Sequence, residues 1–376
     1  MDESMRVGII APWVLEPYLG PSAVAHNTLR GFLKIQNELE KRDIEIVFLS
    51  INGQKKTQDF GNITVIRTKN LPLTTLFAEL RFILGKRMEK LKLDIVHSHS
   101  LCDIFPWLLK KDVAKIFHLH GIFWKERKYT NIYGKFWTWL YEIRLRLYYP
   151  KFTRFVTVSN YVIEELESRG FDVSKVVLIE NPIGDKFFEI KKNEDEIILY
   201  PATIIPRKNH IGFLKACSMI KDDLQDFKVV FTGSGEKEYV EKVRDFAKKE
   251  NLNVEFAGKV PYEKMLDLHS RASIVALVSF EETFGMAVAE AMATGTSVLV
   301  SNIRGLRDTV KHGETGLKAD PNNPKDIAEK LLMLIEDENL RKRLGENAKK
   351  EAERRWRCDI IARKLLELYF EVLENR

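Results

Sequence analysis

The chain has 376 residues, of which 45% are hydrophobic and 30% are charged. This length suits two domains better than one core, and the composition excludes disordered and fibrous proteins. Sixty basic and 54 acidic residues leave a net charge of +6, and the whole surplus falls in residues 123–155. With no apolar run of spanning length, an acidic start and three widely spaced cysteines, we expect a cytoplasmic protein without a secretory signal or disulfides.

Short Val- and Ile-rich runs alternate with helical patterns in the first half of the chain. The predicted strands are Met5–Ile10, Ile44–Leu49, Ile63–Ile66, Asp94–His97, Lys115–Leu119, Phe155–Val158 and Val176–Ile179. Helical spacing predicts helices at Ala23–Lys41, Phe77–Leu91 and Tyr161–Arg169. Such continuously hydrophobic strands are typical of a parallel sheet that is covered on both faces.

The same alternation repeats after a polar stretch at residues 191–196, which we interpret as a linker. The second series predicts strands at Ile197–Tyr200, Lys228–Phe231, Val254–Phe256, Ile274–Val278 and Ser297–Val300. Its helices are predicted at Ile211–Ile220, Glu236–Lys249, Tyr262–Ser270 and Gly285–Thr294. The pattern indicates an α/β protein with two doubly wound, Rossmann-like domains, residues 1–185 and 196–355, that face a cleft.

Residues 278–295 follow an apolar strand, turn, and open an alanine-rich helix. Thr283 is a candidate cap, and the free N–H groups of Phe284, Gly285 and Met286 would form an anion site suited to a phosphate. Glu290 is the one charged residue in the run 286–293. A buried carboxylate needs a partner, which is either an internal Arg or Lys or the hydroxyls of a bound ribose or sugar.

This segment resembles the signature of a large family of retaining glycosyltransferases with the GT-B fold, the glycosyl transferases group 1. The resemblance rests on Glu282 and Glu290, separated by seven residues, with Phe284-Gly285 after the first and residues 291–293 after the second. It continues through residues 295–301, Gly305 and residues 312–317. The family's fold has two Rossmann-like domains, with the last helix, about residues 356–376, packing back toward the first.

The resemblance also assigns a donor-binding site. It places Lys208 on the donor diphosphate, while Thr203 stands where the family has an arginine, so that Arg207 is the candidate for the second positive charge. Gly233 opens a glycine loop close to the donor, and Gly20 belongs to a corresponding loop after the first strand. The remaining donor-binding candidates are Glu290 for the ribose, Lys259 and Val260 near the base, and Phe284, Gly285, Met286 and Ala287 for the diphosphate.

The implied reaction moves a sugar from a UDP-, GDP- or ADP-sugar to a glycan or lipid-linked acceptor with retention. Direct roles in transfer fall to Lys208, to Glu282, which faces the donor sugar, and to His120, which reaches the sugar from the first domain. No metal or other cofactor is expected, because neither His97-Ser98-His99 nor His118-Leu119-His120 has a carboxylate or cysteine at ligand spacing. For His97 and His118 we favour structural hydrogen bonding.

Three alternatives differ in class from a glycosyltransferase. A GT-B epimerase or phosphorylase-like enzyme shares the fold. An NAD-linked dehydrogenase would need a third glycine after Gly233 and Gly235, and Glu238 stands at that position. A basic protein that binds nucleic acid is the weakest alternative.

Residues 123–155 contain eight basic and two acidic residues together with twelve aromatic ones. Trp and Tyr beside Lys and Arg, on a helix expected at residues 134–149, are typical of a helix at a membrane surface. A packed, solvated helix with its aromatic residues in the core is an equally good interpretation. We therefore expect no nucleic acid partner, and either an ordinary surface helix or contact with an anionic membrane at its inner face.

Overall fold

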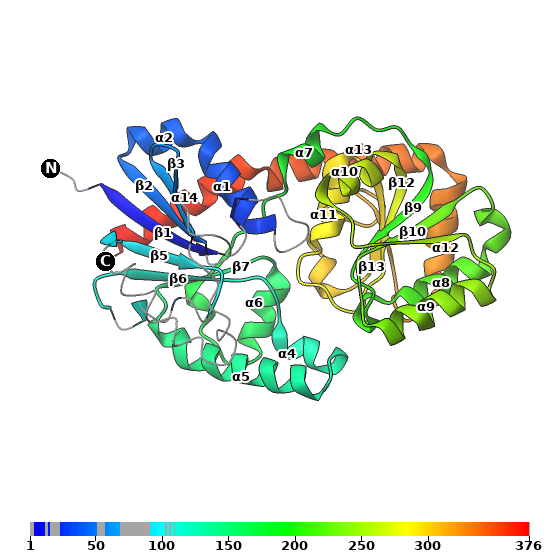
Figure 1. The fold of residues 1–376 in the computed structure, drawn as a ribbon, viewed down its shortest axis with the longest axis horizontal. Helices are drawn as coiled ribbons and strands as arrows, with labels where there is room; N and C mark the ends of the chain where they lie inside the picture. The colour runs from blue at the N-terminus through cyan, green and yellow to red at the C-terminus, as the bar shows by residue number, and fades with distance from the viewer. Residues whose placement is uncertain are drawn as a thin grey trace. The chain divides into compact units, whose positions relative to one another are not determined.

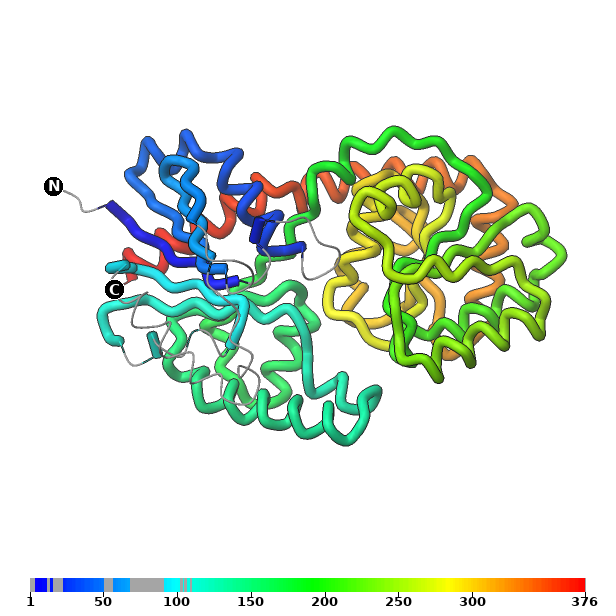
Figure 2. The backbone as a smooth tube through the Cα atoms, viewed as in Figure 1, coloured from blue at the N-terminus to red at the C-terminus, as the bar shows by residue number. Residues whose placement is uncertain are grey.

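The computed structural model describes residues 4–11, 14–15, 23–50, 57–67, 91–101, 104, 107–108 and 110–375. The chain forms two compact units (Figures 1 and 2). Unit 1 comprises Met1–Pro182 and Cys358–Arg376, and unit 2 comprises Ile183–Arg357. The chain therefore passes between the units twice. The first passage lies ahead of the polar stretch 191–196, whose last residues already belong to a strand.

Unit 1 is built on an eight-stranded sheet with the strand order β3-β4-β2-β1-β5-β6-β7-β8. Every pair of neighbouring strands is parallel except β3 with β4. All seven strands that we predicted for this half are confirmed, and β3 was missed. The bounds are β1 (Met5–Ala11), β2 (Ile44–Ser50), β3 (Thr57–Asp59), β4 (Ile63–Arg67), β5 (Ile95–Ser98), β6 (Ala114–Leu119), β7 (Arg154–Thr157) and β8 (Val176–Leu178).

The helix predicted at Ala23–Lys41 is two helices, because the backbone of Ile35 departs from helical geometry with φ of −103° and ψ of 19°. The predicted helix at residues 77–91 lies outside the described residues, apart from its last residue. The described helices of unit 1 are α1 (Val24–Lys34), α2 (Gln36–Lys41), α4 (Phe123–Glu126), α5 (Ile132–Tyr148), α6 (Asn160–Glu167) and α14 (Cys358–Glu374).

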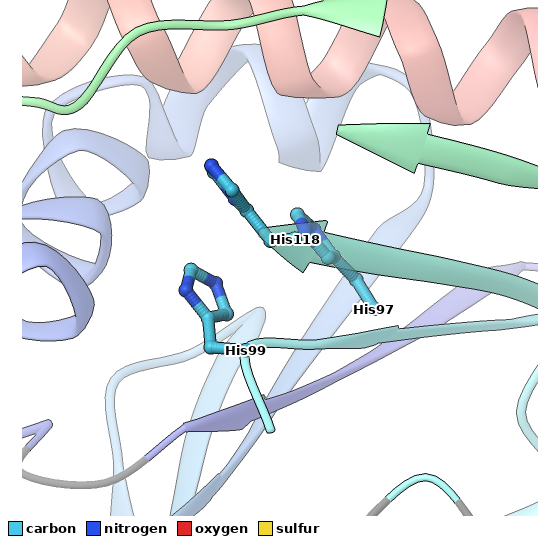
Figure 3. A group of neighbouring side chains, drawn as sticks. All are labelled: His97, His99 and His118. Atoms are coloured by element: carbon cyan, nitrogen blue, oxygen red, sulfur yellow. The ribbon is translucent and has the colours of Figure 1, made fainter. Parts of the chain in front are cut away.

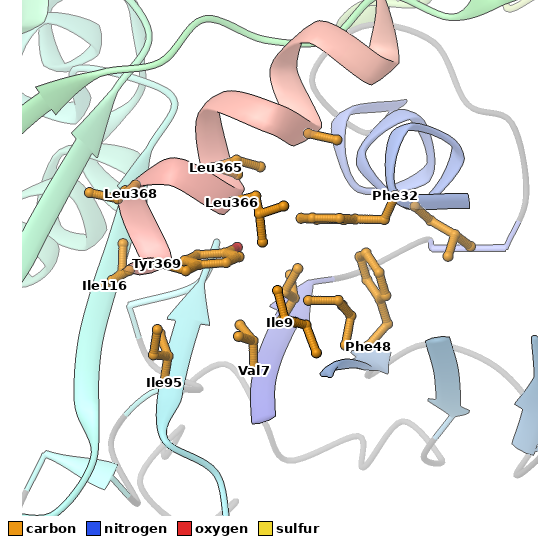
Figure 4. Packing of buried hydrophobic residues seen from close by; sticks show 14 of the residues in the cluster. Val7, Ile9, Phe32, Phe48, Ile95, Ile116, Leu365, Leu366, Leu368 and Tyr369 are labelled. Atoms are coloured by element: carbon orange, nitrogen blue, oxygen red, sulfur yellow. The ribbon is translucent and has the colours of Figure 1, made fainter. Parts of the chain in front are cut away.

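Helix α14 returns from the end of the chain to complete the core of unit 1 (Figure 4). The ring of Tyr369 on α14 stacks on Phe32 of α1, with 6.4 Å between the ring centroids, and Phe32 meets Phe48 of β2 edge-on. Val7 and Ile9 of β1 are fully buried in the same cluster. Burial of these large side chains supplies most of the driving force that holds α14 on the sheet.

Unit 2 is built on a six-stranded parallel sheet with the order β11-β10-β9-β12-β13-β14. All five predicted strands are confirmed, and the short edge strand β14 was missed. The strands are β9 (Asp195–Pro201), β10 (Lys228–Thr232), β11 (Val254–Gly258), β12 (Ala272–Leu277), β13 (Ser297–Ser301) and β14 (Leu317–Ala319). The helices are α7 (Asp185–Glu189), α8 (His210–Met219), α9 (Lys237–Lys249), α10 (Tyr262–Arg271), α11 (Met286–Thr294), α12 (Pro324–Glu336) and α13 (Glu338–Trp356).

Both units are thus parallel α/β sheets with helices between successive strands, which confirms the predicted fold class of two Rossmann-like domains. Among the described residues, the helices all fall short of the length and apolar character that crossing a bilayer requires.

Hydrogen bonds and close packing hold the chain in place on each side of its two passages between the units. In unit 2 the N–H of Ile183 donates to the carbonyl of Trp356 over 2.8 Å, so the two passing segments pair with each other. In unit 1 the Asn27 amide donates to the carbonyl of Pro182 over 3.0 Å. Helix α1 also approaches α14 closely at Gly31, where an added Cβ would lie 2.2 Å from the carbonyl oxygen of Cys358.

We expect Gly31→Ala to lower the free energy of unfolding by about 1–3 kcal/mol, because a methyl group at this position must push the backbone of α14 away. The measurement is urea unfolding of the full chain. Gly121→Ala is the matched control, because no atom lies within 4 Å of its added Cβ. Equal unfolding midpoints for the two variants would contradict the proposed tight contact.

Candidate functional site

The carboxyl ends of the parallel strands of unit 2 all meet at one edge of the sheet. The loops that leave β11, β10, β9 and β12 lie there in spatial order, because these four strands are neighbours. They carry residues 259–261, 233–236, 202–209 and 278–285. Most of the predicted donor-binding residues are therefore gathered at this edge, although they are spread over some eighty positions of the sequence.

Lys208 and Glu282 form an ion pair between the loops that follow β9 and β12. Both side chains are nearly buried, with 14% and 9% of their surfaces exposed. Burial raises the pKa of Glu282, but the attraction of Lys208 and Arg207 and the hydrogen bond from Lys208 outweigh it and hold the pKa below its ordinary value. The Glu282 carboxyl group is therefore ionised at neutral pH.

A buried tyrosine and a buried asparagine hold these two loops together. The Tyr200 hydroxyl, at the end of β9, donates to the carbonyl of Lys208 and accepts from the N–H of Val278 over 3.1 Å. The Asn209 amide donates to the carbonyls of Val278 and Pro321 over 3.0 and 2.8 Å. Sequence reasoning missed both residues. Their signals were a tyrosine that ends a wholly apolar strand and an asparagine suited to the left-handed conformation, which Asn209 adopts with φ of 53°.

Arg207 and Thr203 lie in the same loop as Lys208. The Arg207 guanidinium donates to the carbonyl of Glu281 over 2.8 Å, and the N–H of Phe280 donates to the carbonyl of Arg207 over 2.9 Å. Thr203 is exposed. The positive charge of Arg207 thus lies close to the Lys208–Glu282 pair, whereas the threonine brings no charge there.

The glycine loop joins the end of β10 to the start of α9, as predicted. A Cβ on Gly233, whose φ is 93°, would lie 2.5 Å from the carbonyl oxygen of Ala202, and one on Gly235 would lie 1.9 Å from that of Ile204. The N–H of Gly233 donates to the carbonyl of Gly258 over 2.7 Å. These glycines are therefore required by close packing of neighbouring loops, whether or not a ligand also approaches them.

Helix α11 begins at Met286 with Gly285 at its cap. The prediction of Thr283 as the cap is wrong, because the chain enters the helix through the left-handed conformation of Gly285, with φ of 77°, and no side chain caps it. A Cβ at Gly285 would lie 2.6 Å from a methyl group of Leu306. The N–H groups at the start of an α-helix have no partner within the helix, so those of Met286 and Ala287 open toward this edge of the sheet.

The remaining donor-binding candidates lie in different parts of the chain. Glu290 lies one turn into α11 with 4% of its surface exposed, and the ring of Phe284 is buried against Trp356 at 5.5 Å between centroids. Lys259 is exposed and Val260 is half-buried just after β11. Gly20 of the first half lies outside the described residues.

The two histidine pairs of unit 1 form one stacked cluster at the ends of β5 and β6. Figure 3 shows that His97, His99 and His118 project to the same side of the sheet. The rings of His118 and His120 lie 4.1 Å apart, centroid to centroid, with 19° between their planes. His97 makes the structural hydrogen bond that we expected, to the Tyr369 hydroxyl over 2.8 Å. The same expectation is wrong for His118, because neither of its ring nitrogens has a partner among the described residues.

Three of these histidines bring one nitrogen each within 4.8 Å of one another: His97, His99 and His118. Their ring planes differ by only 11° to 33°. A nitrogen lone pair lies in the plane of its ring, so rings stacked this nearly parallel do not aim their lone pairs at one point 2.0–2.1 Å away, as zinc requires. The side chains would have to rotate before they could chelate an ion.

His120, the histidine assigned to the donor sugar, is held by hydrogen bonds at both ring nitrogens. Its Nδ1 lies 3.1 Å from the amide oxygen of Asn181, which only accepts, so Nδ1 carries the hydrogen. Its Nε2 then accepts the hydrogen bond from Nδ1 of His99 over 2.8 Å. Burial lowers the pKa of His120 to about 4, even though the bond to Asn181 raises it, so the ring is neutral at pH 7. Sequence reasoning missed this contact.

The free energy of unfolding should fall as the pH drops from about 6.5 toward 4. Burial lowers the pKa of His97 to about 3 and shifts His118 in the same direction, so the unfolded chain binds protons in this range that the folded chain does not. We expect His118→Leu to reduce the slope by at most about 1.4 kcal/mol per pH unit, since this ring makes no hydrogen bond that leucine would lose. Chemical unfolding of both proteins at a series of pH values measures it, and an unchanged slope would contradict the buried, neutral state of His118.

Comparisons with known proteins agree with this geometry. The profile described as Glycosyl transferases group 1 matches residues 183–351, and the one described as Glycosyltransferase Family 4 matches residues 30–186. An uncharacterized glycosyltransferase of Methanocaldococcus jannaschii is 26% identical over 96% of this chain and 97% of its own. The N,N'-diacetylbacillosaminyl-diphospho-undecaprenol alpha-1,3-N-acetylgalactosaminyltransferase of Campylobacter jejuni is 25% identical over 89% of this chain and 93% of its own.

Among solved structures, the sucrose-phosphate synthase of Thermosynechococcus elongatus superimposes with a TM-score of 0.76 at 17% identity, covering 99% of this chain and 100% of its own. The HepE protein of Anabaena, in complex with UDP and glucose, gives 0.72 at 16% identity, covering 97% and 99%. Together, the two matched profiles account for nearly all of the chain beyond residue 30. The chain is therefore a glycosyltransferase with the GT-B fold, and its residues 183–351 match the glycosyl transferases group 1 family.

Proposed function

We propose that the protein transfers a sugar from a nucleotide-sugar to an acceptor, with retention at the anomeric carbon and without a divalent metal. The observation that carries this proposal is the convergence of Lys208, Glu282 and the start of α11 at one edge of the unit 2 sheet. A cation beside free helix N–H groups suits a diphosphate.

The chemistry of sugar transfer needs such a site. Breaking the bond between sugar and phosphate leaves a nucleoside diphosphate, whose growing negative charge must be stabilised. The Lys208 ammonium and the N–H groups of Phe284, Gly285, Met286 and Ala287 would supply this stabilisation from fixed positions. In many enzymes that cleave diphosphates a metal ion does this work, and here the protein groups would take its place.

Glu282 gives the site a second property. Its carboxylate neutralises Lys208 as long as no donor is bound, and a diphosphate must compete with it for the ammonium group. Once Lys208 binds the diphosphate, Glu282 is released toward the donor sugar, where it would accept hydrogen bonds from hydroxyl groups and orient the ring. The pair thus links donor binding to the positioning of the sugar.

The other residues take supporting roles in the proposal. Glu290 would bind the ribose hydroxyls, and Lys259 and Val260 would lie by the base. Gly233 would allow the diphosphate close to the backbone, and Arg207 would add positive charge. His120, neutral and held by Asn181, would exchange the hydrogen bond that its Nε2 accepts from His99 for one from a hydroxyl of the donor sugar.

For the acceptor we propose a glycan or a lipid-linked sugar. Support comes from the name of the Campylobacter relative, which includes a diphospho-undecaprenol-linked sugar. We propose that the protein works in the cytoplasm, at the inner face of the membrane where such an acceptor is exposed. A GT-B epimerase or phosphorylase-like enzyme remains the second candidate, and it differs in its products when no acceptor is present.

Lys208→Ala should weaken binding of nucleoside diphosphates about 10- to 100-fold, because a hydrogen bond to a charged group contributes about 1.5–3 kcal/mol. Isothermal titration with UDP, GDP and ADP measures this effect. Lys228→Ala is the matched control, because its ion pair with Glu255 lies at the opposite edge of the same sheet. Equal affinity of the Lys208→Ala variant and the wild type for every nucleotide would contradict the site.

Glu282→Gln should have the opposite effect on binding. Because Lys208 then has no carboxylate to compete with the diphosphate, we expect affinity for the nucleoside diphosphate to be equal or higher, while the rate of sugar transfer falls at least tenfold. Titration together with a transfer assay separates these two effects. Parallel loss of binding and transfer would show that Glu282 acts only by supporting the loop.

Sugar transfer should persist after dialysis against EDTA, and the product should keep the anomeric configuration of the donor. Proton NMR of the product reads the configuration, and omission of the acceptor tests the alternative enzymes. An inverted product or activity restored only by Mg²⁺ or Mn²⁺ would contradict the mechanism. Conversion of the donor without an acceptor would favour the epimerase or phosphorylase-like alternative.

A further inference from the structure

Helix α5 of unit 1 presents its apolar side chains to the solvent. Of the nine large hydrophobic residues that are exposed in the described part of the chain, five lie on this one helix of 17 residues (α5 in Figure 1). Their exposed fractions range from 50% to 86%: Ile132 86%, Tyr133 68%, Leu147 63%, Phe136 52% and Trp139 50%. Single exposed hydrophobic residues are ordinary, but a cluster of this kind marks an interaction surface.

The spacing shows that these side chains share one face. Ile132, Phe136, Trp139 and Leu147 follow one another at intervals of four, three and eight residues, which correspond to whole helical turns. The side of the helix that packs on the unit carries the buried residues Glu142 and Leu145. Glu142 accepts hydrogen bonds from Arg127 over 2.6 Å and from Arg169 over 2.5 Å. The helix therefore buries its one acidic residue and exposes five large apolar ones, which is unusual for a surface helix.

Basic residues border the exposed apolar face. Lys135 and Arg146 lie along one side of it and Arg144 along the other, as their positions on a helix of 3.6 residues per turn require. Lys128, just before the helix, and Lys151, just after it, are exposed as well. Glu142 is the only acidic residue of α5, and it points away from this face.

The structure reduces the charge that the sequence indicated for residues 123–155. At least four of its eight basic residues pair with carboxylates of unit 1: Lys125 with Glu165, Arg127 and Arg146 with Glu142, and Arg154 with Glu371. The sequence count missed Glu165 and Glu371 because they lie outside the stretch. The exposed lysines of the stretch, Lys128, Lys135 and Lys151, lie on α5 or within four residues of its ends.

We infer that α5 docks unit 1 on the surface of an anionic lipid bilayer. Ile132, Phe136, Trp139 and Leu147 enter the boundary between headgroups and acyl chains, and the neighbouring lysines and arginines contact lipid phosphates. Trp and Tyr side chains prefer this interface because they combine an apolar ring with a polar group. The docked helix lies in the plane of the surface. Docking on a bilayer would bring the protein to the lipid-linked acceptor that we propose. Only this purpose of the docking rests on the proposed function, because the docking itself is argued from the residues of α5.

Charge favours a bilayer over a second copy of this chain. Two copies that met through this face would bring the basic borders of both helices together, and like charges in a closing contact repel. A bilayer that contains anionic lipids supplies both complementary properties at once, an apolar interior and a negative surface.

The test is co-sedimentation of the full chain with two kinds of vesicle. One contains phosphatidylcholine alone, and the other also contains phosphatidylglycerol, an anionic lipid, at about 30%. We expect binding to the anionic vesicles at least tenfold above that to the neutral ones, reduced at about 0.5 M NaCl by screening. The triple variant Ile132→Ser, Phe136→Ser, Trp139→Ser should lose at least nine-tenths of this binding.

A matched control removes three exposed hydrophobic residues elsewhere: Leu178→Ser, Met219→Ser and Met333→Ser. It should bind vesicles as the wild type does. Titration with nucleotide of the wild type, the α5 variant and the control variant tests the docking surface independently of the proposed transfer. We expect the α5 variant to bind nucleotide as the wild type does. Equal vesicle binding by the α5 variant and the wild type would overturn the inference. The inference would also be overturned if the wild type did not bind anionic vesicles. The same holds if the wild type formed a dimer that the substitutions in α5 abolish.

Discussion

The candidate site of unit 2 depends on one interaction, the nearly buried ion pair between Lys208 and Glu282. Two opposite charges withdrawn from water stabilise each other only when the loops that carry them are held precisely. Removing either residue leaves the other with a nearly buried charge that needs a new partner. In the mechanism that we propose, the diphosphate of the donor replaces the Glu282 carboxylate, so that the Lys208 ammonium group keeps an anionic partner.

The residues around the ion pair hold the loops that carry it. Tyr200 and Asn209 join the loops after β9 and β12, and Gly233 and Gly235 let the loop after β10 pack directly on the loop after β9. Gly285 then turns the chain so that α11 starts beside the pair. Neighbouring parallel strands deliver all of these loops to one edge. Unit 1 contributes a different chemistry, a stack of neutral histidines in which His120 is fixed by Asn181 and His99.

The sequence was sufficient for the fold and for much of the site. Continuous apolar runs and helical spacing located twelve strands, and the run from Glu282 to Glu290 located the helix start. What it could not provide came from contacts between distant residues. Only the folded loops show that Glu282 pairs with Lys208, that Tyr200 supports both, and that Glu165 and Glu371 neutralise part of the basic stretch. Short edge strands such as β14, with three residues, carry too little pattern to be recognised.

Hydrogen–deuterium exchange of the full chain, with and without saturating nucleoside diphosphate, tests the central claim most directly. A ligand that binds the free N–H groups and fixes the loops must slow their exchange. We predict protection of residues 203–209, 233–236 and 282–287, all at the carboxyl edge of the unit 2 sheet, with the amino edge unchanged. Bound nucleotide that leaves these three segments unprotected would contradict the account.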